Sequence, residues 1–284
     1  EWVVDYWTSR IPTDPFKIKT ISAIDHTQAL TDSLKGTKSN VELINFLCHV
    51  DYLRNSDIQE EQKLGKNLYE KIKEIIDNCL DNGHFKYIRR TEMMPVVEQN
   101  GHEVSFDKLS MGNIFLIEHL VMLVCKMYSI CVLNHKSPDE LTNIPGVLLI
   151  DEIENHLHPQ WQKKVLGIIR KTFPALQIIL TTHSPFVVSS AQGARIYVCE
   201  PQPGYSEIKD MTDYYANLPV EEVLQTEIFD VGPFNEEISR LMDSRKKAYR
   251  ENRTEEARAI EQKLFEINPN YFCYLKPLIS DNPA

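Results

Sequence analysis

The clearest pattern in the chain is a run of four apolar residues, Val147 to Ile150, that ends in two adjacent acids, Asp151 and Glu152. A short apolar run with such an ending is typical of a buried parallel strand. In an open α/β sheet, the last residues of such a strand lie at the carboxyl edge, where ligands bind. The pattern therefore predicts a carboxylate pair at a ligand-binding edge.

A helix and a second strand follow this first strand. Pro159 occupies the expected first position of the helix, and basic residues close its last turn, as the helix dipole favours. The apolar run from Leu176 to Leu180 then predicts the next strand. We therefore expect residues 147–182 to form a strand–helix–strand unit with parallel strands and a right-handed crossover.

The hydrophobic period changes twice upstream of this unit. Residues 41–80 carry apolar positions at spacings of three and four, which predicts helix. Residues 85–106 predict three strands, and the pair Asn100-Gly101 is a strong signal for a hairpin between the last two. The segment after Gly112 is apolar on so many faces that it predicts a buried helix.

The first 40 residues are less regular. Residues 2–7 and 16–21 look like strand or sheet-edge segments. The tetrapeptide 36–39 superficially resembles the end of a phosphate-binding loop, but Thr37 separates its glycine from its lysine. We favour the alternative, a loop that caps the helix before Val41.

The C-terminal part of the chain is predicted to be mostly helical. A strand at residues 194–199 leads to a hairpin at Pro203-Gly204. Thr254 is expected to be the N-cap of the last of three helices. These helices are predicted at residues 220–229, 235–251 and 254–267.

Composition narrows the class of protein. With 284 residues, 42% hydrophobic and 25% charged, the chain has the composition of an ordinary globular protein. A net charge of -10 argues against a surface that generally coats nucleic acid. No apolar run reaches the roughly 18 residues of a membrane span, and no signal peptide is recognisable, so we expect a cytoplasmic protein without a membrane contact. Because the chain starts at Glu1 and its first methionine is Met93, we expect a fragment of a longer protein.

The acid pair and a later histidine are candidates for catalysis. A Mg²⁺ ion between phosphate oxygens needs only one or two carboxylates, and Asp151 is our metal-facing candidate. Glu152 leaves the strand at a different angle and could act as general base on an attacking water. His183 follows the next strand, so its imidazole could approach the same phosphate. Each of these residues also has a structural alternative, because strand ends often carry solvated polar groups.

A third motif, Leu109-Ser110-Met111-Gly112, precedes the apolar helix. A serine hydroxyl, a glycine that permits close backbone approach and a helix N-terminus together make an anion site. The alternative is structural, since serine is a favoured N-cap.

In this order, the three motifs resemble an ABC-type ATPase head of the RecF, SMC and bacterial defence kind. In that family, Leu-Ser-x-Gly opens the signature helix, residues 147–152 match the Walker B strand, residues 154–158 match the loop that follows, and His183 matches the switch histidine. The sequence Glu-Asn-His-Leu-His-Pro at residues 154–159 resembles the corresponding loop of the overcoming-lysogenisation-defect (OLD) ATPases and of the Septu or retron-associated ATPases. The motifs cover about residues 105–190.

The resemblance implies a partial P-loop-NTPase-like α/β head with a helical insert and a helical tail. It also implies that two heads sandwich ATP and Mg²⁺ and that Leu109, Ser110 and Gly112 of one head contact the nucleotide of the other. The family's phosphate loop is missing here, and we expect it upstream. The expected domains are an incoming partial lobe or linker (1–40), the insert (41–84), the ATPase core (85–215) and the tail (216–284).

The expected function is ATP hydrolysis in a head-to-head dimer or higher oligomer that controls an effector, such as a nuclease or nucleic acid, in anti-phage defence. One alternative is a non-hydrolysing scaffold that dimerises and holds an effector. Another is that the chain itself cuts nucleic acid, but no Asp-x-Asp pattern follows the switch motif. His156 and His158 could also share a hydrolytic metal, although we favour a turn and dimer contact for them.

Overall fold

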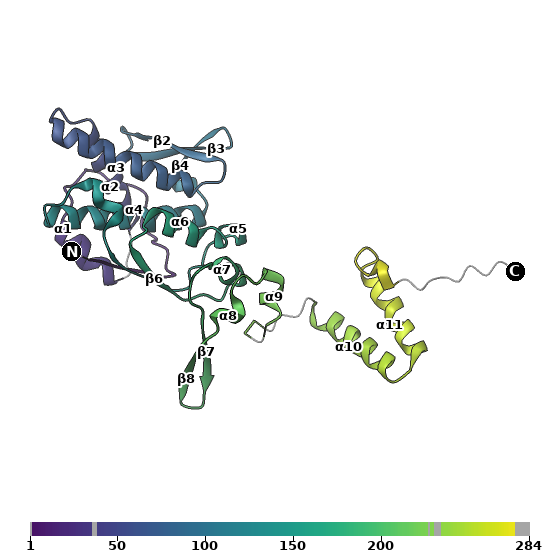
Figure 1. Ribbon diagram of the computed structural model, residues 1–284. Helices are drawn as coiled ribbons and strands as arrows, with labels where there is room; N and C mark the ends of the chain where they lie inside the picture. Colours follow the sequence, from purple (N-terminus) through teal and green to yellow (C-terminus); the bar gives the residue numbers. More distant parts are fainter. Residues whose placement is uncertain (1, 36–38, 227, 230–233, 276–284) are drawn as a thin grey trace. The chain divides into compact units, whose positions relative to one another are not determined.

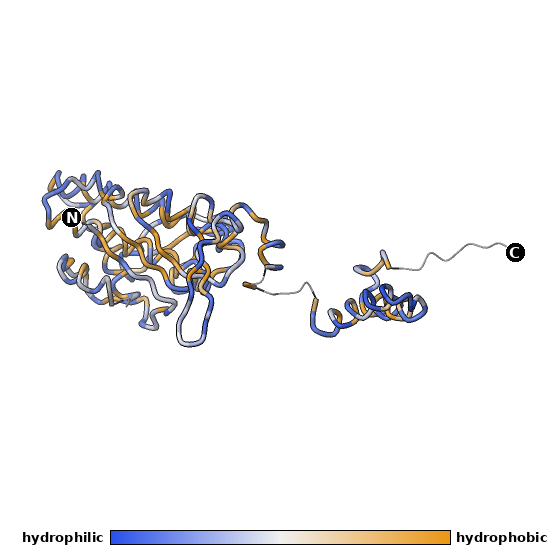
Figure 2. The backbone as a smooth tube through the Cα atoms, turned by 60° about the horizontal axis from the view of Figure 1, so that its bottom comes forward, coloured by the Kyte–Doolittle hydropathy of each residue, from blue (hydrophilic) through white to orange (hydrophobic). Residues whose placement is uncertain are grey.

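The computed structural model describes residues 2–35, 39–226, 228–229 and 234–275. The chain divides into two compact units (Figure 1). The first comprises Glu1–Ile196 with Thr212–Asn217, and the second comprises Tyr197–Met211 with Leu218–Ala284. The hydrophobic stretches of the first unit gather in its interior (Figure 2), so this unit has a substantial core of its own.

The first unit is organised around a three-stranded parallel sheet. Its order is β1 (Val3–Trp7), β5 (Gly146–Ile150) and β6 (Leu176–Leu180). Trp7 pairs with Ile150, and Ile150 pairs with Leu180, so the carboxyl ends of all three strands are aligned. The predicted parallel strand–helix–strand unit is confirmed. Its crossover contains two short helices, α5 (Pro159–Gln162) and α6 (Val165–Thr172), with Pro159 at the start as predicted.

The N-terminal segment takes part in this sheet. The strand predicted at residues 2–7 is confirmed as β1, whereas residues 16–21 form no strand. Residues 36–38 of the phosphate-loop-like tetrapeptide lie outside the described residues. Ser39 is the N-cap of α2 (Asn40–Arg54) and accepts a hydrogen bond from the backbone N–H of Glu42, which confirms the capping interpretation.

One long buried helix, α4 (Met111–Leu133), packs against β1 of the sheet. Asp5 of β1 and Lys126 of α4 form a buried ion pair across this interface. By length and composition alone α4 could cross a membrane, so the expectation that no segment is long and apolar enough was wrong. However, 89% of its apolar window is buried inside the unit, which is what the core helix of a globular domain requires.

A second sheet and a helical pair complete the first unit. The helical pattern of residues 41–80 is confirmed as α2 and α3 (Gln59–Asn78), and the three predicted strands are confirmed as an antiparallel sheet. Asn100 and Gly101 both have positive φ, as the hairpin signal predicts. The strands are β2 (Gly83–Arg89), β3 (Met94–Gln99) and β4 (His102–Ser105). The remaining short helices are α1 (His26–Thr31), η1 (Asp32–Lys35), η2 (Phe106–Lys108), η3 (Pro138–Asn143), α7 (Pro185–Ser190) and α8 (Thr212–Tyr215).

The second unit contains a hairpin and a helical region. The predicted hairpin is confirmed, but its first strand begins at Tyr197 rather than at residue 194. The N-cap of α11 is Arg253, so the prediction of Thr254 as the cap was wrong; Thr254 is the first helical residue. The elements are β7 (Tyr197–Gln202), β8 (Tyr205–Asp210), α9 (Val220–Leu224), α10 (Glu236–Arg250), α11 (Thr254–Ile267) and η4 (Phe272–Leu275).

Candidate functional site

The acid pair lies where β5 ends, next to the end of β6. The hydroxyl of Thr181 donates a hydrogen bond to Oδ1 of Asp151 at 2.7 Å. The same hydroxyl accepts a hydrogen bond from the backbone N–H of Glu152 at 2.9 Å. On the other side, the backbone N–H of Asp151 donates to the carbonyl of Trp7 at 3.0 Å. The position of Asp151 is therefore fixed by both neighbouring strands, while its side chain remains exposed.

Glu152 begins a tight turn. Its φ of 51° lies in the left-handed region, which non-glycine residues rarely adopt and which costs on the order of 1–3 kcal/mol unless the surroundings hold it. Asn155 holds the turn by donating from Nδ2 to Oε2 of Glu152 at 2.6 Å. Glu152 is half-buried whereas Asp151 is exposed, so the two carboxylates have different surroundings.

His183 lies at the same edge of the sheet, just after β6. Its backbone N–H donates to Oε1 of Glu154 at 2.6 Å, and the Thr182 hydroxyl donates to Oε2 of the same carboxylate at 2.5 Å. The loop after the acid pair is therefore bonded to the loop that carries the histidine. The imidazole of His183 belongs to an exposed residue, so it is accessible from this edge.

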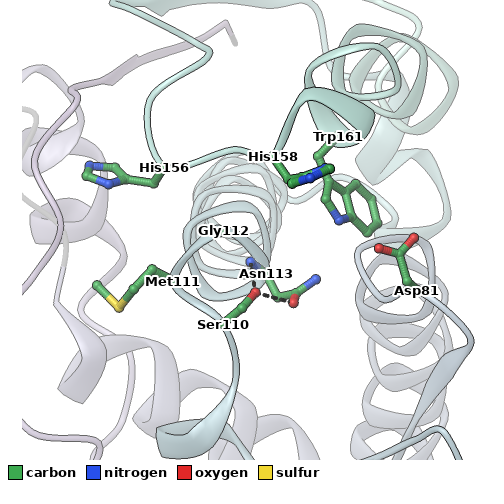
Figure 3. A pocket seen from close by; sticks show the side chains of 8 residues that line it. All are labelled: Asp81, Ser110, Met111, Gly112, Asn113, His156, His158 and Trp161. Atoms are coloured by element: carbon green, nitrogen blue, oxygen red, sulfur yellow. Dashed lines mark hydrogen bonds between the residues drawn. The ribbon is translucent and has the colours of Figure 1, made fainter. Parts of the chain in front are cut away.

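The start of α4 lines a separate pocket of about 350 Å³ (Figure 3). Its walls come from the start of α4, from the loop that follows the acid pair, from α5 and from the turn between α3 and β2. The lining residues are Asp81, Ser110, Met111, Gly112, Asn113, His156, His158 and Trp161. The structure thus divides the candidate residues into two groups, with Ser110 and Gly112 in this pocket and the acid pair with His183 at the strand ends.

Ser110 is the N-cap of α4, as the structural alternative predicts. Its hydroxyl oxygen accepts a hydrogen bond from the backbone N–H of Asn113 at 3.2 Å and is also hydrogen-bonded to the side-chain oxygen of Asn113. Asn113 in turn donates to the carbonyl of Cys79 at 2.6 Å. Leu109 is buried beside Ser110, which is itself exposed. The cap fixes the Ser110 side chain at the mouth of the pocket.

Gly112 is required by a close backbone contact. A Cβ atom at this position would lie 2.7 Å from the carbonyl oxygen of His156. The loop at residues 154–158 therefore packs directly on the first turn of α4, and Figure 3 shows the rings of His156 and His158 on opposite sides of Gly112. Any movement of this loop must therefore be accommodated by the first turn of α4.

The two loop histidines are engaged in structural contacts. Nε2 of His156 lies 2.9 Å from the carbonyl of Ser9, so it carries the proton and donates. Nδ1 of His158 accepts a hydrogen bond from the backbone N–H of Gln160 at 3.3 Å and caps α5. Within the part of the chain that the structure describes, no group of three or more His, Cys, Asp or Glu residues could hold a metal. The geometry thus gives no support to a His-x-His hydrolytic metal site.

Two residues that matter for the geometry were not singled out in the sequence. Thr181 bridges both members of the acid pair, and Glu154 binds the loop of His183. Both lie inside motifs that the sequence does mark, one directly before Thr182-His183 and the other two positions after Glu152. The sequence motifs could therefore have drawn attention to both residues. Their hydrogen-bond partners, however, are about thirty residues away along the chain, and only the pairing of β5 with β6 shows which residues meet.

Comparison with known proteins identifies relatives over part of the chain. A retron Vc95 probable ATPase from Vibrio cholerae serotype O1 biovar El Tor is 32% identical over 148 residues, which cover 52% of this chain and 27% of that protein. The Septu protein PtuA of Bacillus thuringiensis is 29% identical over 170 residues, which cover 57% of this chain and 40% of that protein. The chain therefore spans less than half the length of these relatives.

Among solved structures, the Smc head domain of Pyrococcus yayanosii is similar with a TM-score of 0.38 and 16% identity, covering 58% of this chain and 31% of that one. That similarity is too weak to support a functional comparison. The sequence resemblance to ABC-type ATPase heads of bacterial defence systems, and the P-loop-ATPase-like α/β fold that it implies, are confirmed by the family match. The model of the family described as "AAA domain, putative AbiEii toxin, Type IV TA system" matches residues 25–189, more than half of the chain, and the chain belongs to this family.

Proposed function

We propose that this chain supplies the metal, base and switch residues of an ATPase head that hydrolyses ATP with Mg²⁺ in the full-length protein. The observation that carries the proposal is the alignment of the three strand ends, which brings Asp151, Glu152 and the His183 loop to one edge of the parallel sheet. Ligands bind at this edge in open α/β sheets. Membership of an ATPase family supports the same assignment.

Asp151 is the residue we assign to Mg²⁺. A single strand-end carboxylate suits this ion, which keeps several waters and takes its other ligands from phosphate oxygens. The Thr181 hydroxyl engages one oxygen of Asp151, and we assign the other oxygen to the metal or its water. When bound, Mg²⁺ would neutralise charge that develops on the phosphate oxygens.

Glu152 is our general base. The Thr181 bond fixes its backbone, and Asn155 engages only one of its carboxylate oxygens, Oε2. Oε1 is then the atom we assign to accept the proton of the attacking water. His183 on the neighbouring loop would orient the same water or contact the terminal phosphate, with the proton remaining on Glu152.

We further propose that the pocket at Ser110 serves a second head. Ser110 and Gly112 line a pocket with His156 and His158 rather than with the acid pair, so one chain presents two half-sites. Two heads facing each other would combine them, and the nucleotide of one head would meet Leu109, Ser110 and Gly112 of the other. The phosphate-binding loop would come from the remainder of the full-length protein, which we place in the cytoplasm.

The partner we infer is an effector, such as a nuclease or a nucleic acid, in anti-phage defence. The support is the names of the relatives, which belong to retron and Septu systems. A non-hydrolysing scaffold is the second candidate, because Ser110 and the two loop histidines also have purely structural contacts in this fold.

Replacement of Glu152 by Gln in the full-length protein tests the assignment. We expect turnover to fall by at least 100-fold while Mg²⁺-dependent ATP binding is kept, because a general base contributes about 10²–10⁴-fold. Unchanged hydrolysis would exclude Glu152 as the base. Absence of turnover in the unaltered protein, under conditions where ATP binds, would favour the scaffold.

A mixing experiment tests the two-headed site. Ser110→Arg heads and heads that lack the phosphate loop should each be inactive alone. Mixed together, they should regain part of the activity through one intact composite site. No recovery in a mixture that forms heterodimers would contradict the assignment of Ser110 to the partner's nucleotide.

A further inference from the structure

We propose that Glu154 is a positioning residue that holds the His183 loop and links it to the first turn of the signature helix. This inference rests on the proposed function, because it gives Glu154 a role through His183. The evidence is the set of contacts made by one half-buried carboxylate between two loops.

Both carboxylate oxygens of Glu154 are engaged by the loop after β6. Oε1 accepts from the backbone N–H of His183 at 2.6 Å, and Oε2 accepts from the hydroxyl of Thr182 at 2.5 Å. Hydrogen bonds to an ionised carboxylate are shorter and about twice as strong as neutral ones. One of these bonds goes to the backbone N–H of His183 itself. The carboxylate therefore fixes the backbone position from which the His183 side chain extends, whichever rotamer that side chain adopts.

A second connection supports the same arrangement. The side chain of Gln162 in α5 donates to the carbonyl of Leu157 at 2.8 Å and accepts from the hydroxyl of Ser184 at 2.5 Å. Ser184 also caps α7 by accepting from the backbone N–H groups of Phe186 and Val187. The two loops are thus joined at both ends of the His183 segment, which leaves little freedom for one to move without the other.

The charge of Glu154 is otherwise difficult to explain. Asp151 and Glu152 already place two carboxylates at this edge, and a third would repel them and the phosphates of a nucleotide. No Lys or Arg pairs with Glu154 among the ion pairs of the described residues. Its hydrogen bonds turn both oxygens toward the β6 loop, so it does not compete for the metal, and they offset part of the repulsion.

The same loop contacts the signature helix two residues further on. The carbonyl of His156 lies against Gly112, in the place that a Cβ atom would need. A shift of His183 would therefore reach Glu154, the backbone at His156 and the start of α4 in turn. In a head dimer, α4 carries the Ser110 that serves the partner's nucleotide, so Glu154 would couple the two composite sites.

Steady-state ATPase kinetics of full-length variants test the inference. We expect Glu154→Ala to lower kcat more than tenfold while the KM for ATP changes less than threefold. Glu154→Gln should recover at least part of the loss, because its side-chain oxygen can still accept from the backbone of His183. The matched control is Glu74→Ala, which removes an exposed glutamate of α3 and should leave kcat within twofold.

A double variant separates positioning through His183 from a general effect. If Glu154 acts through His183, then Glu154→Ala combined with His183→Ala should be no slower than His183→Ala alone. The inference would be overturned if the double variant lost kcat by the product of the two single-variant losses. It would also be overturned if the kcat of Glu154→Ala lay within threefold of that of the unaltered protein. If His183→Ala by itself leaves kcat unchanged, the result contradicts the role proposed for His183 in hydrolysis, and with it the role of Glu154 that depends on His183.

Hydrogen exchange gives a readout that does not depend on turnover. The backbone amide of His183 should exchange at least tenfold faster in Glu154→Ala, and amides in the interior of α4 should keep their protection. If Glu154→Ala does not fold, Thr182→Val keeps the His183 amide bond to Glu154 and removes the hydroxyl that donates to Glu154 and accepts from the backbone N–H of Ser184 at 3.0 Å, so it should give a smaller change in the same direction. Unchanged exchange at His183 in a folded Glu154→Ala protein would show that Glu154 does not hold the loop.

Discussion

The hydroxyl of Thr181 donates to Oδ1 of Asp151 at 2.7 Å. It also accepts from the backbone N–H of Glu152 at 2.9 Å, so one side chain of β6's loop orients both acids at the end of β5. Groups that orient a metal ligand typically change metal affinity by 10- to 100-fold when removed. Thr181→Val keeps the shape of the side chain and removes both bonds.

We expect Thr181→Val to raise the Mg²⁺ concentration needed for half-maximal ATPase activity by at least tenfold. The measurement is a Mg²⁺ titration at saturating ATP. Thr181→Ser is the matched control, because it keeps the hydroxyl, and its titration should lie within threefold of the unaltered protein. Equal titrations for the Val and Ser variants would mean that Asp151 is not the metal-facing residue or does not depend on Thr181.

The contact of Gly112 with His156 makes a prediction about stability. A methyl group at Gly112 would lie 2.7 Å from the His156 carbonyl oxygen, so Gly112→Ala must displace the loop or the helix. Overpacking of this kind costs about 1–3 kcal/mol. Urea unfolding should show a lower midpoint for Gly112→Ala. ATP turnover should fall as well, since the displaced loop carries Glu154.

Gly167 provides the control for this substitution. It lies in α6 and has nothing within 4 Å of the position of an added Cβ atom. Alanine is favoured over glycine in a helix by about 0.5–1 kcal/mol. Gly167→Ala should therefore raise the unfolding midpoint, and the two variants should move in opposite directions. A rise for both would mean that the loop does not rest on Gly112.

Much of the fold could be predicted from local sequence patterns. The apolar runs of β5 and β6, the all-round apolar helix α4 and the Asn100-Gly101 hairpin are each determined by their own residues. Residues 16–21 were wrongly predicted as a strand because an alternating pattern becomes a strand only if a partner strand pairs with it. The pairing partner of β1, by contrast, is β5, about 140 residues away.

The candidate site was only partly predictable for the same reason. The types and positions of Asp151, Glu152 and His183 are visible in the sequence, and parallel pairing was expected to bring their strands together. The bond between Thr181 and Asp151 depends on the exact register, in which Ile150 pairs with Leu180. A shift of one residue would direct Thr181 to the other face. Ser110 was assigned two alternatives, and the structure confirms its N-cap bond.

The buried ion pair of Asp5 and Lys126 makes a third prediction. The two side chains are 0% and 5% exposed, and the indole N–H of Trp7 donates to the other oxygen of Asp5 at 2.9 Å. Removing one partner leaves a buried charge without its counterion, which costs about 3–5 kcal/mol. Lys126→Met should therefore lower the free energy of unfolding by this amount, as measured by urea denaturation.

The half-exposed pair of Arg89 and Glu92 is the comparison for this variant. Arg89→Met should change the free energy of unfolding by less than about 1 kcal/mol, because solvent screens exposed pairs. Combining Asp5→Leu with Lys126→Met should be less destabilising than Lys126→Met alone, since the double variant leaves neither charge of the pair without its counterion. A double variant that is worse than the single one would mean that the pair is required for more than its charge balance.

The stability of the first unit should decrease as the pH falls. Burial lowers the pKa of His26, whose ring is hydrogen-bonded to Ser129, although the charge of Asp25 opposes this shift. Burial also lowers the pKa of His49, and the neighbouring His26 lowers it further. A histidine whose pKa is lower in the folded state binds fewer protons there than in the unfolded state. Its contribution to stability is therefore present above its ordinary pKa of 6.5 and is lost as the pH falls below it.

The melting temperature should therefore fall between about pH 7.5 and pH 5, and the His49→Gln variant should show a shallower decrease. The control is His102→Gln, which shows how replacing an exposed histidine changes the dependence of the melting temperature on pH. If the His49→Gln and His102→Gln proteins follow the same pH curve, His49 is not a source of the acid sensitivity.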